Sequence, residues 1–394
     1  MTDTIHASLT GENLRELKAA CYGEVAGILN GLAPRETVRI PDSYEWLSLV
    51  IPRAFTAALF GEKNNPFAGR NDDNDKGIRA IWEFDKGVAV LALDRFPGLI
   101  VPKAVEARRY LWDLIAPYYE AELWRGEDVS AIIRNRAEKV TREGVPWTVL
   151  ARTEINIPWA AVTNTVPDLF WLMVHVFSRP SSALERFRAE VAELTTFSVD
   201  KDKDGRRTAT IDAEQLEKKP YVSAVYWETH RLYNENLGNR RVMRDTVLRD
   251  PDADNGGREY RLEKGVNVQW ATGAAHRDEG LWGPDADEWR PERWLETSSL
   301  EKKKIMAMKA RIFPFGGGRN LCPGRAFAIS EALGLVAVLA AGFDLEGVRV
   351  PDKVTAARMG AAMRRPEWGP EKDASSMGIR RRVGYEDVVW GFKF

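Results

Sequence analysis

The chain has 394 residues, of which 44% are hydrophobic and 29% charged, so it has enough apolar surface for a sizeable core and is not a disordered chain. Its 57 Lys and Arg residues nearly balance its 58 Asp and Glu residues, so no overall basic charge favours a nucleic-acid partner. The only two cysteines, Cys21 and Cys322, lie far apart and the four histidines are scattered, which excludes a disulfide scaffold and a Cys-x-x-Cys zinc site. A lone cysteine thiolate is therefore the best metal ligand in the sequence.

The first 20 residues are polar and amphipathic. They contain neither the apolar segment of a signal peptide nor the run of about 20 apolar residues that spans a bilayer. We therefore expect no membrane anchor in this chain. The longest apolar stretch, residues 326–343, is interrupted by Ser330 and Glu331, which predicts a buried core helix.

Apolar residues recur at a spacing of three to four through most of residues 1–200, which predicts a mostly helical first half. Four of the expected helices lie at 12–32, 43–61, 102–124 and 129–143. From about residue 240 the pattern changes to short strand-like runs, at 241–248, 258–265 and 266–273. The sequence therefore predicts a mainly α fold with a minor β component. No Gly/Ser-rich linker divides the chain, so we expect a single domain over residues 1–394.

The most informative segment is FPFGGGRNLCPGRAFA, residues 313–328. Its three consecutive glycines, 316–318, permit positive φ and close approach to a flat cofactor, and their N–H groups can face an anion. That anion would be the thiolate of Cys322. Pro323 suits the first position of a helix, which the following apolar run would continue. The alternative is a buried structural cysteine, which is what most lone cysteines are.

Charge around this segment favours the thiolate form of Cys322. The positive end of the following helix and the nearby Arg319 and Arg325 are expected to lower the pKa of the thiol. The sulfur would then remain an anionic ligand for a metal ion.

The segment resembles the haem-binding signature of the cytochrome P-450 haem-thiolate monooxygenases, F-x-x-G-x-R-x-C-x-G. The arginine of the signature is replaced by Asn320, with Arg319 one position earlier. The resemblance implies a haem b cofactor whose iron takes Cys322 as its axial ligand. A propionate of that haem would be held by Arg241 or Arg240, ahead of the first strand. The residues implied to bind the cofactor are Phe315, Gly318, Arg319, Cys322, Gly324 and Arg241.

Two further motifs follow the order that this family shows. Glu228 and Arg231, in YWETHRLY, resemble its E-x-x-R helix, and a spacing of three places them on one helix face. Arg293, in DEWRPERW, resembles the arginine that completes the family's Glu-Arg-Arg triad. The resemblance implies a structural network that clamps the long loop leading to Cys322. The alternative is an ordinary solvated segment around Arg293.

The resemblance also implies a long helix at residues 151–177, on the opposite side of the haem. Its NTVPDLFW stretch resembles the branch that contains steroid 7α-hydroxylase and prostacyclin synthase, in which an asparagine stands where the threonine usually is. Asn164 and Thr165 are therefore the implied catalytic residues, unless this stretch is a surface turn with a polar cap. Asn164 cannot ionise, so it would orient water or peroxide and would not act as the acid. Pro167 lacks an N–H, which predicts a local opening of the helix.

The resemblance implies an enzyme that oxidises a lipophilic small molecule, such as a steroid, a terpenoid or a polyketide-like secondary metabolite. It would use dioxygen and electrons from an NADPH-dependent flavoprotein reductase, for which the basic stretch at 302–311 is a candidate docking site. Two alternatives remain open: a haem-thiolate isomerase or dehydratase that needs no reductase, and a truncated, inactive chain that binds haem poorly. The implied location is the cytosolic face of the endoplasmic reticulum, or otherwise the cytoplasm.

The resemblance runs from about residue 40 to the end and is densest at 160–330, the expected haem-binding core. The family's N-terminal anchor, first sheet and covering loop have no counterpart in the sequence. We therefore expect either a shortened form or a true start upstream of Met1, with low haem occupancy for the chain as written.

Overall fold

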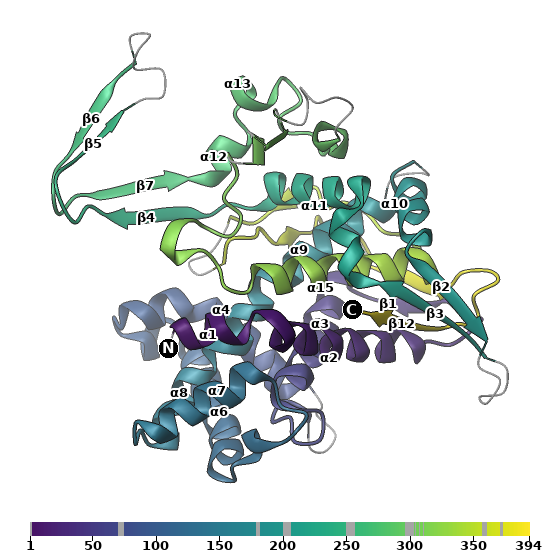
Figure 1. The fold of residues 1–394 in the computed structure, drawn as a ribbon, viewed down its shortest axis with the longest axis horizontal. Helices are drawn as coiled ribbons and strands as arrows, with labels where there is room; N and C mark the ends of the chain where they lie inside the picture. The colour runs from purple at the N-terminus through teal and green to yellow at the C-terminus, as the bar shows by residue number, and fades with distance from the viewer. Residues whose placement is uncertain are drawn as a thin grey trace.

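The computed structural model shows long helices through the first half of the chain and small sheets at the edges of the molecule (Figure 1). The predicted fold class, mainly α with a minor β component, is confirmed. The structure describes all residues except 1, 70–74, 179–181, 200–205, 250–256, 296–302, 304, 307, 310, 357–360 and 371–372.

The helices include the four predicted at 12–32, 43–61, 102–124 and 129–143, which are found as α2, α3, α6 and α7. In chain order the helices are α1 (Thr2–Ser8), α2 (Gly11–Asn30), α3 (Ser43–Phe60), α4 (Lys76–Leu93), α5 (Pro97–Ile100), α6 (Pro102–Glu120), α7 (Ala131–Arg142), α8 (Trp147–Glu154), α9 (Asn156–Phe177), α10 (Ser182–Ala192), α11 (Pro220–Tyr233), α12 (Thr272–His276), α13 (Glu279–Trp282) and α15 (Arg325–Gly342). The 3₁₀ helices are η1 (Leu123–Arg125), η2 (Ala213–Lys218), η4 (Pro291–Trp294) and η5 (Gly318–Asn320).

The strands form small sheets that join segments far apart in the chain. In chain order the strands are β1 (Val38–Ile40), β2 (Thr195–Val199), β3 (Arg207–Asp212), β4 (Leu237–Arg241), β5 (Thr246–Arg249), β6 (Glu259–Leu262), β7 (Asn267–Ala271), β8 (Phe343–Glu346), β9 (Lys353–Val354), β10 (Pro366–Glu367), β11 (Met377–Arg381) and β12 (Val389–Lys393). One sheet has the order β1-β11-β8 and is antiparallel. In another, of order β12-β3-β2, β12 runs parallel to β3.

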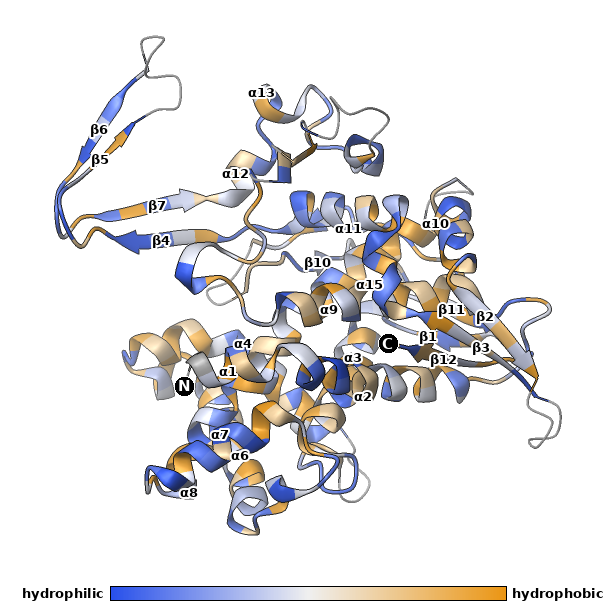
Figure 2. Ribbon diagram, in the orientation of Figure 1, coloured by the Kyte–Doolittle hydropathy of each residue, from blue (hydrophilic) through white to orange (hydrophobic). Residues whose placement is uncertain are grey.

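Helix α9 lies at the centre of the molecule and packs against α3, α4, α10, α11 and α15. All of its residues from Thr165 to Val176 are buried. Apolar residues are concentrated on α9 and α15, whereas β4 is hydrophilic along most of its length (Figure 2). Polar side chains on the inner part of α9 are therefore held in an apolar, close-packed environment.

Two helices replace the single helix predicted at 151–177. Helix α8 ends at Glu154 and α9 begins at Asn156. Pro158 has no N–H and cannot donate to the carbonyl of Glu154, so the hydrogen-bond ladder is interrupted at this turn. Helix α9 then continues through Pro167 without a break, so the predicted opening there does not interrupt the helix.

Helix α15 is long and apolar enough to cross a membrane by length and composition alone. However, 72% of it is buried inside the molecule, as the sequence predicts for a core helix. It approaches α2 closely, because a Cβ at Gly334 would lie only 1.9 Å from the ring of Tyr22. Glycine at this position therefore allows the two helices to pack together.

The runs predicted at 258–265 and 266–273 are found as β6 and β7, whereas the run predicted at 241–248 contains the last residue of β4, a break and most of β5. The four strands form two antiparallel hairpin ladders, β4 with β7 and β5 with β6. The hairpins extend from the body of the molecule as an arm (Figure 1). Most of their side chains are exposed. The residues that connect α11 to β4 lie at the base of this arm, next to the cavity described below.

Candidate active site

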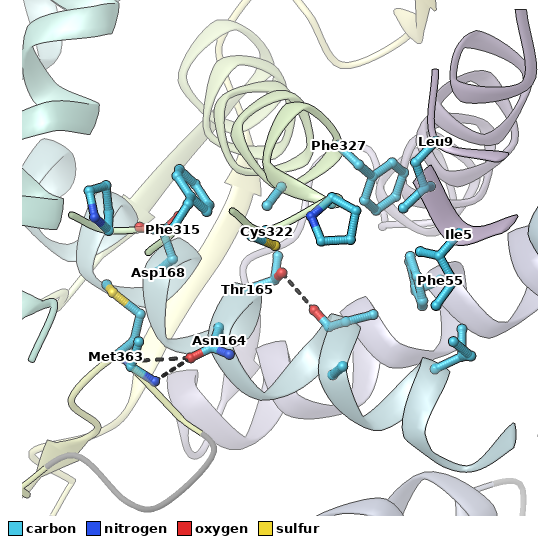
Figure 3. A pocket seen from close by; sticks show the side chains of 18 of the residues that line it. Ile5, Leu9, Phe55, Asn164, Thr165, Asp168, Phe315, Cys322, Phe327 and Met363 are labelled. Carbon is cyan, nitrogen blue, oxygen red and sulfur yellow. Dashed lines mark hydrogen bonds between the residues drawn. The ribbon is translucent and has the colours of Figure 1, made fainter. Parts of the chain in front are cut away.

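A cavity of about 350 Å³ lies between the loop that carries Cys322 and the middle of α9. Figure 3 shows Cys322 next to α9, with Asn164 and Met363 to one side and Phe327 to the other. The helices from the first part of the chain contribute only apolar side chains to its wall. These residues are Ile5, Leu9, Leu17, Phe55, Leu59 and Ile132.

The Cys322 loop takes its shape from glycines with a left-handed backbone. The φ angles of Gly316 and Gly318 are 74° and 65°, a conformation that side chains other than glycine rarely adopt. The N–H of Cys322 donates a hydrogen bond to the carbonyl of Phe315 at 3.0 Å and closes the loop. The loop therefore brings Phe315 and Cys322 together in the wall of the cavity.

Helix α15 begins at Arg325 and not at the predicted Pro323. The carbonyl of Gly324 accepts the bond from the N–H of Ala328 at 2.9 Å, the i to i+4 pattern of an α-helix. Pro323 lies ahead of the N-cap residue Gly324 and so precedes the helix by two positions. The positive end of α15 is nevertheless adjacent to Cys322.

The predicted net lowering of the Cys322 pKa is wrong for the chain alone. Burial raises the pKa of this thiol, and that effect is only partly offset by the N–H groups of Gly324 and Arg325 and by the charge of Arg325. Arg319 is exposed and does not contribute to the shift. A metal ion bound at the sulfur would instead lower the pKa of this thiol, because a metal deprotonates a coordinating thiol.

Glu228, Arg231 and Arg293 form one buried network. Arg231 donates to both carboxylate oxygens of Glu228, at 2.9 Å each, and Arg293 Nε donates to Oε1 at 2.8 Å. Trp294 Nε1 and the main-chain N–H of Arg290 each add a further bond to the same carboxylate at 2.8 Å. The structure thus brings the three residues of the predicted triad together, with the charge of Glu228 fully hydrogen-bonded.

Arg231 extends this network to the segment between α12 and η4. Its guanidinium donates to three main-chain carbonyls, those of His276, Ala286 and Glu288, at 2.7, 2.5 and 2.9 Å. Because these bonds fix the segment to α11, the triad holds part of the chain that precedes the Cys322 loop. The triad residues do not line the cavity.

Asn164 and Thr165 both line the cavity, but each has a side-chain oxygen already bonded. Asn164 Oδ1 accepts from the N–H groups of Ala362 and Met363, at 2.6 and 3.4 Å. Thr165 Oγ1 donates to the carbonyl of Ala161 at 2.6 Å. Asn164 therefore ties a distant segment to α9 and retains its amide N–H groups for other partners (Figure 3).

Of the two arginines considered for the propionate, Arg240 contacts the Cys322 loop and Arg241 does not. Arg240 Nη2 donates to the carbonyl of Gly317 at 3.0 Å, and its guanidinium lies over the ring of Trp270. Side chains alternate along a strand, so Arg241 points to the opposite face of β4. Of the two candidates, Arg240 is therefore the one that the structure places against the Cys322 loop.

Three polar residues of the cavity were not predicted from the sequence: Asp168, His230 and Asn234. Asp168 follows Asn164 by one helical turn, so the α-helical period could have indicated it. His230 lies inside the E-x-x-R motif, at one of the two positions that the motif leaves unspecified. Asn234 Nδ2 donates to the carbonyl of Pro314 at 3.2 Å and thereby connects the end of α11 to the Cys322 loop.

The residues of this cavity fit a flat, largely apolar group with a metal ion at its centre. A Cβ at Gly318 would meet no heavy atom within 4 Å, and one at Gly317 only a ring carbon of Phe313 at 3.8 Å, so this side of the loop is open. Cys322 is a free cysteine that lines the cavity and can supply the one protein ligand that a haem-thiolate site needs. Arg240 and Arg319 are exposed cations near its rim.

Comparisons with known proteins agree with this reading of the site. The cytochrome P450 family model matches residues 92–367. A cytochrome P450 monooxygenase of Gibberella zeae is 30% identical over 99% of this chain and 72% of its own length. The 25-hydroxycholesterol 7-alpha-hydroxylase of Rattus norvegicus is 29% identical over 86% of this chain and 80% of its own length. The monooxygenase nodJ of Hypoxylon pulicicidum is 24% identical over 99% of this chain and 72% of its own length.

The family match extends over most of the chain and includes both walls of the cavity, α9 on one side and the Cys322 loop on the other. The family carries a haem-iron cofactor, and its members that are monooxygenases use a small-molecule substrate, dioxygen and a redox partner. The chain therefore belongs to the cytochrome P450 family and is an oxidoreductase of the monooxygenase type.

Proposed function

We propose that the chain hydroxylates or otherwise oxidises a lipophilic small molecule, with haem b bound through the thiolate of Cys322. The observation that carries the proposal is the single cavity that joins Cys322 to the middle of α9. When bound, the haem would supply the oxygen chemistry, while the protein binds and orients the substrate. We also propose that residues 1–394 act as one haem-thiolate domain.

The residues proposed to hold the haem surround the cavity on the loop side. Cys322 supplies the axial ligand, and Phe315 packs against the group from the same loop. Gly318 and Gly324 leave room for it to approach the backbone. Arg240 and Arg319 supply positive charge for its propionates. This assignment rests on the cavity lining and on the contact between Arg240 and the loop.

Asn164 and Thr165 are proposed to act on the other side of the cavity. Asn164 uses its carbonyl oxygen to hold Ala362, so only its amide N–H groups can orient water or peroxide. Thr165 keeps the lone pairs of its hydroxyl, because its proton is given to the carbonyl of Ala161. Both residues can therefore position an oxygen-containing molecule, and neither can supply a proton as a strong acid.

A lipophilic substrate is supported by the apolar wall from α1, α2 and α3. An apolar pocket favours ligands that bury hydrocarbon surface. A steroid, terpenoid or polyketide-like secondary metabolite is the proposed substrate class. The similarity to the rat 25-hydroxycholesterol 7-alpha-hydroxylase and to fungal P450 monooxygenases supports this class.

An NADPH-dependent flavoprotein reductase is the proposed source of electrons. Arg240, Arg311, Arg319 and Arg325 are exposed near the Cys322 loop and offer positive charge to an acidic partner. Four residues of the predicted basic stretch at 302–311, namely 302, 304, 307 and 310, lie outside the described residues. Turnover that depends on NADPH and reductase would support a monooxygenase, whereas turnover without them would support the isomerase or dehydratase alternative.

Association with the surface of a membrane is proposed from an apolar patch at the end of α4 and in α5. The patch consists of four apolar side chains that are between 59% and 83% exposed: Leu93, Phe96, Leu99 and Ile100. Exposing so much apolar surface to water is unfavourable, and such patches often mark interaction sites. Exposed Asp94 and Arg95 lie between Leu93 and Phe96, and exposed Lys103 follows Ile100, so the two cations can contact anionic lipid headgroups. The endoplasmic reticulum is the proposed location.

Vesicle sedimentation tests this part of the proposal. Phe96→Ser with Leu99→Ser should reduce binding to vesicles of phosphatidylcholine and phosphatidylserine. Val383→Ser, at a side chain that is 82% exposed elsewhere on the molecule, is the control and should bind as the wild type does. Equal binding of all three proteins would contradict the assignment of this patch.

The carbon monoxide difference spectrum of the reduced protein tests the proposed cofactor site. Wild-type protein and Cys21→Ser should give a thiolate-type spectrum, because Cys21 is buried away from the cavity. Cys322→Ser should lose it. A thiolate-type spectrum in Cys322→Ser would contradict the assignment, and no haem in any of the proteins would favour the inactive alternative.

A further inference from the structure

A methionine sulfur lies in the wall of the Cys322 cavity, next to the residue proposed to orient water or peroxide. Met363 lines the cavity and is 3% exposed. Its main-chain N–H donates to Asn164 Oδ1 at 3.4 Å, and Figure 3 shows the two residues side by side. Among the described residues, Met363 is the only methionine that lines this cavity. Its thioether therefore shares one cavity with Cys322 and with the amide of Asn164.

The contacts of Met363 with the end of α11 hold its sulfur in place. Met363 and Asn234 pair as an antiparallel β-bridge, and Asn234 Nδ2 donates to Met363 Sδ at 3.7 Å. The same amide nitrogen donates to the carbonyl of Pro314, ahead of the glycines of the Cys322 loop, at 3.2 Å. One side chain thus connects the sulfur of Met363 to the loop that carries Cys322.

Packing alone does not require sulfur at this position. Leucine has a similar volume, and exchanges between leucine and methionine are usually well tolerated in a core. A thioether differs from a hydrocarbon because it is a weak hydrogen-bond acceptor and because it can be oxidised to a sulfoxide. Since Met363 is buried but lines the cavity, an oxidant reaches its sulfur through the cavity.

We propose that Met363 is an oxidation site of this protein, at which hydrogen peroxide formed in the cavity converts the thioether to a sulfoxide and so makes the cavity wall polar. The inference rests on the proposed function, which supplies the oxidant. Dioxygen that receives two electrons from NADPH and two protons, without oxidising a substrate, becomes hydrogen peroxide. Asn164 lies where it can orient that peroxide beside Met363.

The oxidation needs no reagent other than hydrogen peroxide. A lone pair of Sδ forms a bond to one peroxide oxygen as the O–O bond breaks, and the other oxygen leaves as water with both peroxide protons. Sulfur loses two electrons and the peroxide gains them. The N–H of Asn234 that donates to Sδ can then donate to the sulfoxide oxygen, which is a stronger acceptor. The modified side chain therefore stays attached to α11, while the apolar cavity gains a polar group.

Added hydrogen peroxide tests whether the cavity admits the oxidant to Met363. The purified, haem-loaded protein is treated with peroxide, and peptide mass spectrometry follows the gain of one oxygen atom at each methionine. Met377, on β11, is the matched control, because it is 2% exposed and does not line the cavity. Met363 should be oxidised several-fold faster than Met377, and equal rates would overturn the inference.

Turnover tests whether the peroxide forms inside the cavity. The protein is incubated with NADPH and reductase, without added substrate, and catalase in the solution destroys the peroxide that escapes. Met363 should still be oxidised, whereas Met243, which is 75% exposed, should remain unmodified. Oxidation of both methionines, or of neither, would contradict the formation of the oxidant in the cavity.

Two substitutions test the effect of oxidation on the cavity wall. Met363→Gln places an amide oxygen in the wall, much as a sulfoxide does, whereas Met363→Leu is apolar and cannot be oxidised. The affinity for 4-phenylimidazole relative to imidazole, from absorbance titrations, measures how well the cavity holds an apolar ring. This ratio should fall in Met363→Gln and in peroxide-treated wild type, but not in peroxide-treated Met363→Leu. An unchanged ratio in the treated wild type would contradict the polar wall.

The carbon monoxide spectrum separates this inference from the proposed function. A thiolate-type spectrum together with equal oxidation of Met363 and Met377 would contradict the inference alone. A wild-type protein without that spectrum would contradict the role of Cys322, and the comparison of the two methionines would still show whether peroxide reaches Met363 through the cavity.

Discussion

Asn164 and Ala362 lie 198 positions apart in the chain and are joined by a hydrogen bond of 2.6 Å from the main-chain N–H of Ala362 to the side-chain oxygen of Asn164. The bond attaches the segment around Met363 to α9, directly at the cavity. Asn164, which is proposed to orient water or peroxide, therefore also holds one wall of the cavity in place.

Asn164→Ala should retain haem but release more hydrogen peroxide per NADPH consumed. The substitution leaves the N–H of Ala362 without its acceptor, which costs about 1–3 kcal/mol and loosens the cavity wall. Asn164→Asp keeps the acceptor oxygen and should retain the wall, as measured by thermal unfolding. Peroxide release at the wild-type level in Asn164→Ala would contradict the proposed role.

Glu228→Gln should reduce both stability and haem content. One buried arginine loses its counter-charge, and breaking such a pair costs on the order of 3–5 kcal/mol. The matched control is Glu292→Gln, in the neighbouring η4, because its bond to Arg186 is exposed and worth about 1 kcal/mol or less. Denaturant unfolding and haem per chain are the measurements, and equal losses in the two variants would count against the network.

Glu331 should make stability fall as the pH rises from about 5 to about 8. Burial, and after it the charge of Asp168, raises the pKa of this carboxyl from 4.5 to about 8, against the opposing effect of the bond from Cys21. Between these values the folded chain holds a proton that the unfolded chain has released, so unfolding becomes easier as the pH increases. Each unit of the raised pKa corresponds to about 1.4 kcal/mol.

Glu331→Gln isolates this effect, because the amide keeps an acceptor for Cys21 but cannot titrate. The variant should show a flatter dependence of the unfolding free energy on pH than the wild type does over the same range. Parallel curves for the two proteins would show that Glu331 does not hold a proton in the folded state.

Gly334→Ala should destabilise the fold by about 1–3 kcal/mol, because the added methyl group would overlap the ring of Tyr22. Gly27→Ala, in the facing helix α2, is the control, since no heavy atom lies within 4 Å of its Cβ position. That substitution should stabilise by up to about 1 kcal/mol through helix propensity. Thermal unfolding of both variants measures the difference, and a stable Gly334→Ala would mean that the two helices can separate at little cost.

Apolar spacing and short strand-like runs in the sequence predicted many of the helices and strands. Helices such as α3 and α7 follow from apolar spacing alone, and the strands β6 and β7 follow from short runs between turn residues. The start of α15 and the division between α8 and α9 were missed. Both errors occur next to prolines, where the pattern of apolar residues does not show which hydrogen bonds are lost.

The candidate site could be predicted only where a motif marks it. Cys322 and Glu228 carry motifs, and in the structure Cys322 lines the cavity while Glu228 bonds Arg231 and Arg293. His230 and Asp168 meet across two helices, and no local pattern records that contact. The choice between Arg240 and Arg241 depends on which face of a strand meets the Cys322 loop, which is a matter of tertiary packing.

The hydrogen bonds of Glu228 also set an order in which the site can form. Its carboxylate takes bonds from residues 62 to 66 positions later, and the cavity wall at Asn164 needs residue 362. Such distant contacts form late, because the intervening chain must first be restrained. During synthesis the ribosome will therefore release nearly the whole chain before the cavity has its final wall. A haem that binds in this cavity would therefore meet its complete wall only after nearly the whole chain has been made.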